Sequence, residues 1–354
     1  MFTPLSLAPG VVAPNRVWLA PLTNMQSHPD GTCSDAEVRF LEQRADGGFG
    51  LVETCAAYVS PEGKAWPGEL GVHDDAMSTG LTRLAARIHA GGALASAQLF
   101  HGGLRATPDV SGQPRWSASP WTEAGAEARG GTDADIAAVI DAFAAAARRC
   151  ADAGFDVVEL HGAHGYLLSQ FQSTVYNTRT DAWGGSLDHR ARLIRAVARA
   201  VRAAAPGVVL AVRLSPEDFG QAKGIDLDET LQLAAWLAED GMGLLHLSLW
   251  RSASSTVKRP GVHPTPLFRD AVGPLPIVVA GGIWTRDDAQ TQLDRGADAV
   301  ALGRAAIAWH DWPRRIAAGE TPAGPPYAPA HLEAEGLAPG FVDYMRRWKG
   351  FVDG

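Results

Sequence analysis

The chain contains little cysteine, no long apolar run and no surplus of basic residues. Cysteine occupies only three of the 354 positions, Cys33, Cys55 and Cys150, which are widely spaced and odd in number. Such usage excludes a CxxC-type zinc site or iron–sulfur cluster and fits a reducing cytoplasm. No apolar run reaches the roughly 18 residues that a membrane span needs.

The charge balance and the first residues exclude further classes of protein. The net charge is −8 and no block of Lys or Arg occurs, which argues against nucleic acid or an anionic membrane as a partner. The start, MFTPLSLAPG, lacks a basic segment followed by an apolar core, so no secretory signal is evident. With 46% hydrophobic residues, the chain is expected to be a globular cytoplasmic protein.

Short apolar runs alternate with helical patterns along most of the chain. Near-continuous apolar runs are typical of parallel strands that are buried on both faces. Eight such runs occur, at 16–22, 50–55, 94–100, 157–161, 208–214, 244–250, 277–282 and 299–304. Alanine-rich helical patterns cover 135–153 and 190–204, and helix starts of the capping-box kind stand at Ser34-x-x-Glu37 and Asp226-x-x-Glu229.

Eight β–α units over this length predict the α/β class and a single TIM (β/α)8 barrel. We expect one domain over residues 1–354, with excursions at 56–75 after the second strand and 101–131 after the third, and a tail at 335–354. The alternative is a doubly wound sheet, but no GxGxxG motif follows the first strand as a dinucleotide fold would require.

Polar and glycine residues follow the expected strands, where a TIM barrel builds its active site. The strand ends read Pro21-Leu22-Thr23, Ala56, Gln98, His161, Arg213, Trp250, Gly281-Gly282 and Gly303-Arg304. We expect an anion site at the last two strand ends, where barrels commonly bind phosphate. It would consist of backbone N–H groups that glycine leaves accessible, an adjoining helix N-terminus and one arginine. The ligand is therefore expected to carry a phosphate.

Arg213 and Gln98 indicate what the rest of that ligand is. A guanidinium at the barrel axis favours a ligand that becomes negative during turnover, and a carboxamide offers a donor and an acceptor to a heteroaromatic edge. A reduced isoalloxazine meets both demands, and Thr23 adds a hydroxyl for the opposite ring oxygen. FMN is the favoured cofactor, and a sugar phosphate stays open as the alternative.

The stretch HGAHGY, residues 161–166, places His161, His164 and Tyr166 directly after a strand. They share a site only if the segment is irregular, which Gly162 and Gly165 permit. A metal is one interpretation, but no third ligand is at hand, so we expect none. The other is an oxyanion hole of two imidazole N–H donors, with the phenol as a proton donor.

At this point the chain resembles the old yellow enzymes, FMN-dependent NAD(P)H:flavin oxidoreductases that reduce activated alkenes. The matching motifs run over most of the chain in the same order. They are Asn15-Arg16, Ala20-Pro21-Leu22-Thr23, Val59-Ser-Pro-Glu-Gly63, Gln98-Leu-Phe-His-Gly-Gly103, His161-Gly-Ala-His164-Gly-Tyr166, Asn177-Thr-Arg-Thr-Asp-Ala-Trp-Gly-Gly-Ser186, Arg213-Leu-Ser215, Ala280-Gly-Gly-Ile283, Leu302-Gly-Arg304 and Trp309-His-Asp-Trp-Pro313.

The resemblance implies non-covalent FMN, with NAD(P)H as the electron donor. It places the cofactor against Pro21, Leu22, Thr23, Ala56, Gln98, Arg213, Gly281, Gly282, Gly303 and Arg304. It further implies that His161 and His164 hold the substrate's activating oxygen while Tyr166 donates the proton. Trp66 and Trp250 are expected to narrow the substrate pocket, since Trp250 replaces a smaller residue of many relatives.

The expected activity is reduction of an alkene conjugated to a carbonyl or nitro group by ping-pong hydride transfer. Two alternatives stay open: FMN-dependent dehydrogenation or demethylation of N-methyl amines on the same barrel, and a colourless sugar-phosphate isomerase or aldolase. The tail at 335–354 carries aromatics and Arg346-Arg347. It is compatible with a homo-oligomer, in which it docks on a second subunit, and equally with capping of its own barrel.

Overall fold

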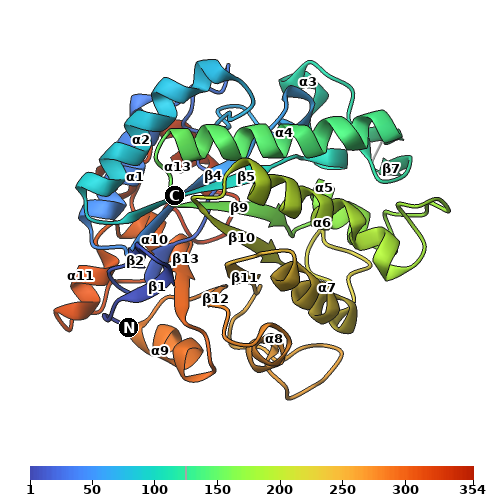
Figure 1. The fold of residues 1–354 in the computed structure, drawn as a ribbon. Helices are drawn as coiled ribbons and strands as arrows, with labels where there is room; N and C mark the ends of the chain where they lie inside the picture. Colours follow the sequence, from blue (N-terminus) through green and yellow to red (C-terminus); the bar gives the residue numbers. More distant parts are fainter. Residues whose placement is uncertain (124–125) are drawn as a thin grey trace.

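The computed structural model describes residues 1–123 and 126–354 (Figure 1). Within these ranges, eight parallel strands close into a barrel in the order β3-β4-β5-β9-β10-β11-β12-β13. Their bounds are Val17–Leu19, Leu51–Tyr58, Leu94–Phe100, Val157–Gly162, Val209–Leu214, Leu244–Ser248, Ile277–Ala280 and Ala299–Leu302. The predicted TIM barrel is confirmed.

Helices surround this barrel and pack their apolar faces on it (Figure 1). They are α1 (Asp35–Asp46), α2 (Ser78–Ala90), α4 (Asp133–Asp152), α6 (Leu187–Ala204), α7 (Leu227–Glu239), α8 (Pro264–Val272), α9 (Arg286–Asp294), α10 (Arg304–Ala308) and α11 (Trp312–Ala317). Ser34 and Asp226 cap α1 and α7 as predicted. The Glu37 carboxylate does not complete a reciprocal box; it accepts a hydrogen bond from Asn24 at 2.8 Å.

Two expected boundaries are wrong. β4 continues to Tyr58, with a register shift between Glu53 and Ala56, so the first residues of the expected 56–75 excursion belong to the barrel. β3 ends early at Leu19, which leaves Pro21, Leu22 and Thr23 in the following loop. The irregular pairing of β4 with β5 keeps Ala56 beside the barrel axis. In a regular strand, side chains alternate strictly between the two faces, and Ala56 would not be expected there.

The remaining segments lie outside the barrel wall. The 101–131 excursion contains α3 (Pro108–Ser111) and a small sheet of β6 (Trp116–Ser117), β7 (Trp121–Glu123) and β8 (Ala126–Gly130). Positions 124–125 of that excursion fall outside the described residues. The helix α5 (Leu167–Gln172) follows β9 directly. No helix in the described ranges has both the length and the apolarity that crossing a bilayer demands.

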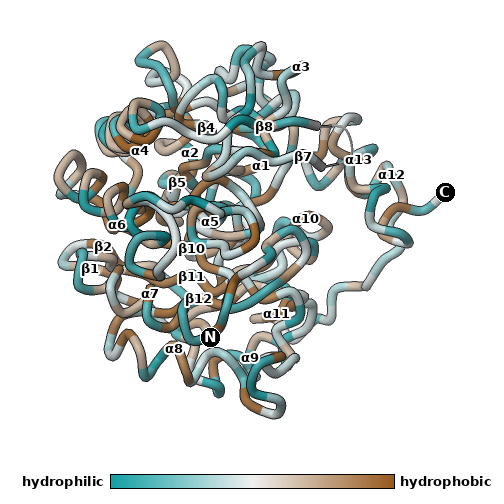
Figure 2. Tube along the Cα trace, turned by 90° about the vertical axis from the view of Figure 1, so that its right-hand side faces the viewer, coloured by the Kyte–Doolittle hydropathy of each residue, from teal (hydrophilic) through white to brown (hydrophobic). Residues whose placement is uncertain are grey.

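The two terminal segments of the chain lie on opposite sides of the barrel in Figure 2, the N-terminal hairpin at the left and the C-terminal helices at the right. The hairpin of β1 (Leu5–Ala8) and β2 (Val11–Ala13) packs Leu7 and Ala13 against the first residues of the strands. α12 (Pro329–Ala334) and α13 (Pro339–Met345) lie at the opposite end, where the strands finish.

The C-terminal tail packs on its own barrel. Phe341 of α13 is fully buried and meets Phe40 of α1 edge-on, with ring centroids 5.4 Å apart. Farther along, Val352 pairs with Tyr327 in an isolated bridge and Phe351 is buried. Of the two interpretations of the tail, the capping one is therefore realised in this chain; a homo-oligomer through the tail stays a prediction.

Candidate active site

Two adjoining cavities open at the carboxyl ends of the strands. The first, here called the His–Tyr cavity, has a volume of about 210 Å³. It is lined by Pro21, Leu22, Thr23, Ala56, Trp66, Gln98, His161, His164, Tyr166, Arg213, Arg304, Ile307, Tyr344, Met345 and Trp348. The second, the glycine cavity, measures about 560 Å³, and its lining includes Gly281, Gly282, Gly303, Trp250 and Trp284. Leu22, His164, Arg213 and Arg304 line both.

The structure thus brings the sequence-predicted residues to one mouth, with one difference in placement. Trp250 lines the glycine cavity and not the His–Tyr cavity. Its side chain is 65% exposed and packs on Phe219, with ring centroids 4.5 Å apart. Trp66, by contrast, lines the His–Tyr cavity.

The HGAHGY segment is irregular. β9 ends at Gly162, and His164 and Gly165 then adopt φ values of +60° and +72°. A positive φ is uncommon for a residue with a Cβ, and it turns the chain sharply before Tyr166 caps α5. As a result the His161 ring lies 4.9 Å from both the His164 ring and the Tyr166 ring, between centroids. A regular helix would have separated Tyr166 from the histidines.

Burial sets the protonation of these three groups. It lowers the pKa of His161 and of His164 well below 6.5, helped by the nearby Arg213. Burial also raises the pKa of Tyr166 above its usual value of 10. At neutral pH the two imidazoles are therefore uncharged and the phenol keeps its proton. The backbone N–H of Ala163 donates to Nδ1 of His161 at 3.4 Å, so Nε2 of His161 carries the ring proton.

Ser248, at the end of β11, connects Arg213 to His164, and sequence reasoning missed it. Its Oγ accepts a hydrogen bond from the Arg213 guanidinium at 3.2 Å and lies 2.6 Å from Nε2 of His164. Because arginine only donates, the Ser248 proton is free to point to His164 Nε2, which leaves the proton of His164 on Nδ1. Ser248 lies inside the apolar run at 244–250, and a polar residue within that run was the sequence signal that could have revealed it.

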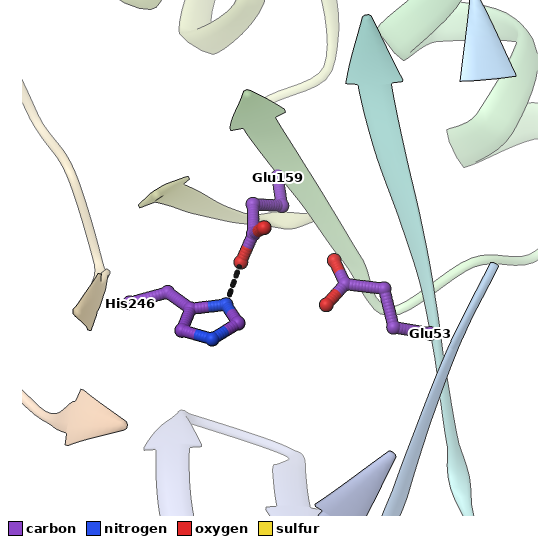
Figure 3. A group of neighbouring side chains, drawn as sticks. All are labelled: Glu53, Glu159 and His246. Atoms are coloured by element: carbon purple, nitrogen blue, oxygen red, sulfur yellow. Dashed lines mark hydrogen bonds and ion pairs between the residues drawn. The ribbon is translucent and has the colours of Figure 1, made fainter. Parts of the chain in front are cut away.

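A buried polar network lies beneath the His–Tyr cavity, inside the barrel (Figure 3). Gln98 donates to Glu159 at 2.7 Å, and the other Glu159 oxygen lies 2.7 Å from Nδ1 of His246. Glu53 accepts from Ser96 at 3.0 Å. Glu53, Glu159 and His246 come from β4, β9 and β11, and sequence reasoning missed all three. The sequence feature that could have revealed them is a charged or polar residue inside an otherwise apolar strand.

The network contains one ionised carboxylate. Burial, and then the charge of Glu159, raise the pKa of Glu53 well above its usual range, so Glu53 is protonated. Burial opposes ionisation of Glu159 too, but His246 and Arg213 outweigh it and hold the pKa of Glu159 low. Glu159 therefore balances the buried charge of Arg213, and its hydrogen bond orients the Gln98 carboxamide toward the cavity wall.

The residues around the two cavities fit FMN. Nε of Arg213 is buried and has no hydrogen-bond partner among the described residues, although the side chain lines both cavities. Such an orphaned donor is satisfied by an acceptor on a bound ligand. Arg304 is exposed to solvent and lines both cavities, and the described residues offer it no ion pair.

The phosphate end of the site depends on glycine. Gly281 has φ +147°, and a Cβ there would come within 1.9 Å of the Leu249 carbonyl oxygen. At Gly303 a Cβ would meet only Leu22, at 3.5 Å, so the backbone is open to the cavity. The helix after Gly281-Gly282, α9, begins only at Arg286, and Thr285 and Asp288 cap its N-terminus reciprocally. The helix after Gly303, α10, begins directly at Arg304 and has no side-chain cap, so the expected helix N-terminus adjoins the second glycine end.

This fold and site define a class: a TIM barrel that holds a phosphorylated flavin at the carboxyl ends of its strands. A model of the NADH:flavin oxidoreductase / NADH oxidase family matches residues 1–322. The chain belongs to this family, and it uses FMN and NAD(P)H.

Individual proteins agree with the family. The chain is 36% identical over 331 residues to the probable NADH-dependent flavin oxidoreductase YqiG of Bacillus subtilis, covering 90% of this chain and 88% of YqiG. Among solved structures, the old yellow enzyme homologue of Zymomonas mobilis is 30% identical with a TM-score of 0.80, covering 90% and 92% of the two chains. Morphinone reductase in complex with tetrahydroNAD is 29% identical with a TM-score of 0.83, covering 94% and 93%.

Proposed function

We propose that this oxidoreductase reduces the C=C bond of alkenes conjugated to a carbonyl or nitro group. The observation that supports this proposal is the convergence of two neutral imidazoles and one protonated phenol on the His–Tyr cavity. Family membership accounts for the flavin and for NAD(P)H, but not for these three groups. A substrate that develops negative charge on an oxygen and then needs a proton at carbon requires all of them.

Each residue has a defined task in this reaction. FMN, when bound, would supply the hydride-transfer chemistry that links NAD(P)H to the substrate. Arg213, with its unpaired Nε, would balance negative charge in the cavity, and Gln98, held by Glu159, would contact the flavin ring. His161 and His164 donate hydrogen bonds to the activating oxygen of the substrate, and so stabilise the enolate. Tyr166 gives its proton to the α-carbon, which completes the addition of two hydrogens across the double bond.

Two other activities were compatible with the sequence. A colourless sugar-phosphate isomerase or aldolase does not agree with membership in a flavin-dependent family. Oxidation of N-methyl amines uses the same cofactor, but it removes hydride from the substrate and develops no oxyanion. In that reaction, the two imidazole N–H donors would have no negatively charged oxygen to stabilise.

The direction of electron flow tests the proposal. The flavoprotein is reduced anaerobically with NADH or NADPH and then mixed with 2-cyclohexenone, while flavin absorbance and product are followed. We expect reoxidation with formation of cyclohexanone. In a parallel experiment, oxidised protein is mixed with sarcosine. Bleaching of the flavin by sarcosine, with no reoxidation by the enone, would establish the amine activity instead.

The protonation states predict a flat pH profile for the alkene-dependent step. The pKa values of His161 and His164 lie well below 6.5 and that of Tyr166 lies above 10. Across the interval between, both imidazoles stay neutral and the phenol stays protonated. We therefore expect the stopped-flow rate constant for reoxidation by 2-cyclohexenone to vary less than about threefold from pH 6.5 to pH 9.5. A titration with an apparent pKa between 7 and 9 would contradict these assignments.

A further inference from the structure

A third cavity lies beside the His–Tyr cavity and has no assigned role. It measures about 360 Å³ and is here called the arginine cavity, because Arg105 and Arg347 both line it. Thr23, Trp66, Tyr166 and Tyr344 line it as well as the His–Tyr cavity. The proton donor Tyr166 therefore stands between the two spaces, and a molecule that reacts beside Tyr166 can extend past it into the arginine cavity.

The charge of this cavity has one sign. No Asp or Glu stands among its described lining residues, and neither arginine makes an ion pair within the part of the chain that is described. Arg105 is held in place: one guanidinium nitrogen donates to the His164 carbonyl oxygen at 2.7 Å, and the group stacks 4.3 Å from the Tyr166 ring centroid. Its remaining N–H groups are available to a ligand.

Arg347 approaches from the other wall, on the segment that follows α13. It is exposed and lies over the Tyr344 ring at 4.8 Å from the centroid. The neighbouring Arg346 differs, because it bonds to the Gly354 carbonyl at 2.6 Å, lies 3.5 Å from Asp343 and lines none of the three cavities. Two unpaired guanidinium groups facing one space favour a planar oxyanion, since their donor forks match carboxylate and phosphate oxygens.

The wall between them is preformed. Met25, which also lines the arginine cavity, has φ +53°, a rare value for a residue with a side chain. Its backbone packs closely on Gly68, where a Cβ would lie 2.5 Å from the Met25 carbonyl oxygen. Residues in strained backbone conformations are frequent at binding sites, where the surrounding structure holds them in place.

We propose that the arginine cavity is a subsite for an anionic group on the molecule whose reacting end occupies the His–Tyr cavity. The group is a carboxylate or a phosphate. It belongs either to an alkene that carries an acidic side chain or to the nicotinamide nucleotide. The subsite rests on the proposed function only in the first case, because the nucleotide visits the same cavity in the first half-reaction.

The test compares Arg347→Gln with the matched control Arg346→Gln, which removes the same charge one residue away. The substrates are a 2-cyclohexenone with a carboxymethyl side chain and its methyl ester. We expect Arg347→Gln to lower kcat/KM for the acid about tenfold relative to the ester, as loss of one charge-assisted hydrogen bond predicts. Arg346→Gln should keep the acid-to-ester ratio of the parent protein.

The nucleotide is separated from the substrate by the reductive half-reaction. If the anion is a nucleotide phosphate, Arg347→Gln raises the Kd of NADH or NADPH about tenfold in anaerobic stopped flow and leaves the acid-to-ester ratio unaltered; this outcome also supports the subsite. Equal effects of Arg346→Gln and Arg347→Gln in every assay would show only a long-range charge effect and would overturn it.

A binding measurement keeps the subsite testable even if the chain reduces no alkene. Oxidised protein is titrated with 4-hydroxyphenylacetate and with its methyl ester, and the flavin absorbance change gives each Kd. We expect Arg347→Gln to weaken binding of the acid about tenfold more than binding of the ester. Equal weakening of acid and ester, or none, together with an unaltered Kd of NADH and NADPH, would reject the subsite, whereas failure of the proposed function shows up separately as absent enone turnover.

Discussion

Replacing Tyr166 with phenylalanine will slow reoxidation of the reduced flavin by 2-cyclohexenone by about two to four orders of magnitude. This is the range that a positioned general acid contributes, and the phenol is the protonated group beside His161. Reduction of the flavin by NAD(P)H requires no proton from Tyr166 and should change far less. Stopped-flow measurement of the two half-reactions separates these steps.

The matched control is Tyr344→Phe, which removes the other tyrosine hydroxyl of the His–Tyr cavity. Tyr344 packs on Trp348 and makes no ring contact with His161 or His164 among the described residues. We expect the rate of flavin reoxidation by 2-cyclohexenone in Tyr344→Phe to stay within about threefold of the rate in the parent protein. Should Tyr166→Phe reoxidise as fast as Tyr344→Phe, the proton must come from elsewhere, and the proposed role of Tyr166 is wrong.

The second large effect is expected for His161→Ala. Loss of one donor from an oxyanion hole typically costs about 10²–10³ in rate, or about 2.7–4 kcal/mol of transition-state stabilisation. His161 is buried, and its Nε2 carries the ring proton because Nδ1 accepts from Ala163. The same donor holds the enolate-like oxygen of a bound phenol. We therefore expect slower reoxidation by enones and weaker phenol binding together.

The conservative variant His161→Asn separates the hydrogen bond from simple packing. Asparagine keeps a neutral N–H donor at this position, so it should recover a large part of the rate and of the phenol affinity that alanine loses. The thermal unfolding midpoint of each variant is measured alongside, because His161 also contacts the Phe100 ring at 5.9 Å. Asparagine and alanine variants with identical rates would count against the oxyanion hole.

Much of the fold followed from local patterns. Strands buried on both faces are largely apolar, so the runs at 94–100 and 208–214 were recognisable from composition alone, and the structure has strands at Leu94–Phe100 and Val209–Leu214. Helix starts at Ser34 and Asp226 followed from capping chemistry, which involves only neighbouring residues. The end of β4 did not, because its register shift arises from pairing with β5, more than 40 positions away along the chain.

In the active site, too, features set by neighbouring residues could be predicted, and features set by contacts between distant residues could not. Gln98, His161 and Arg213 were predicted because a polar residue near the end of an apolar strand stands out, and parallel strands finish at one edge. Glu159 and His246 lie 87 positions apart, and only closure of the barrel brings their side chains to 2.7 Å. Likewise, nothing local indicated that Tyr344 and Trp348 would form a wall of the His–Tyr cavity, since tail docking depends on the barrel surface.

The sequence by itself determined the barrel, the mouth at which chemistry occurs and the types of groups available there, because periodicity, capping and strand ends are short-range properties. Only the tertiary structure decided which groups share a hydrogen bond, which carry a proton and which cavities join. Those properties depend on burial and on distances between strands, and both are set when the barrel closes and the tail folds over its mouth.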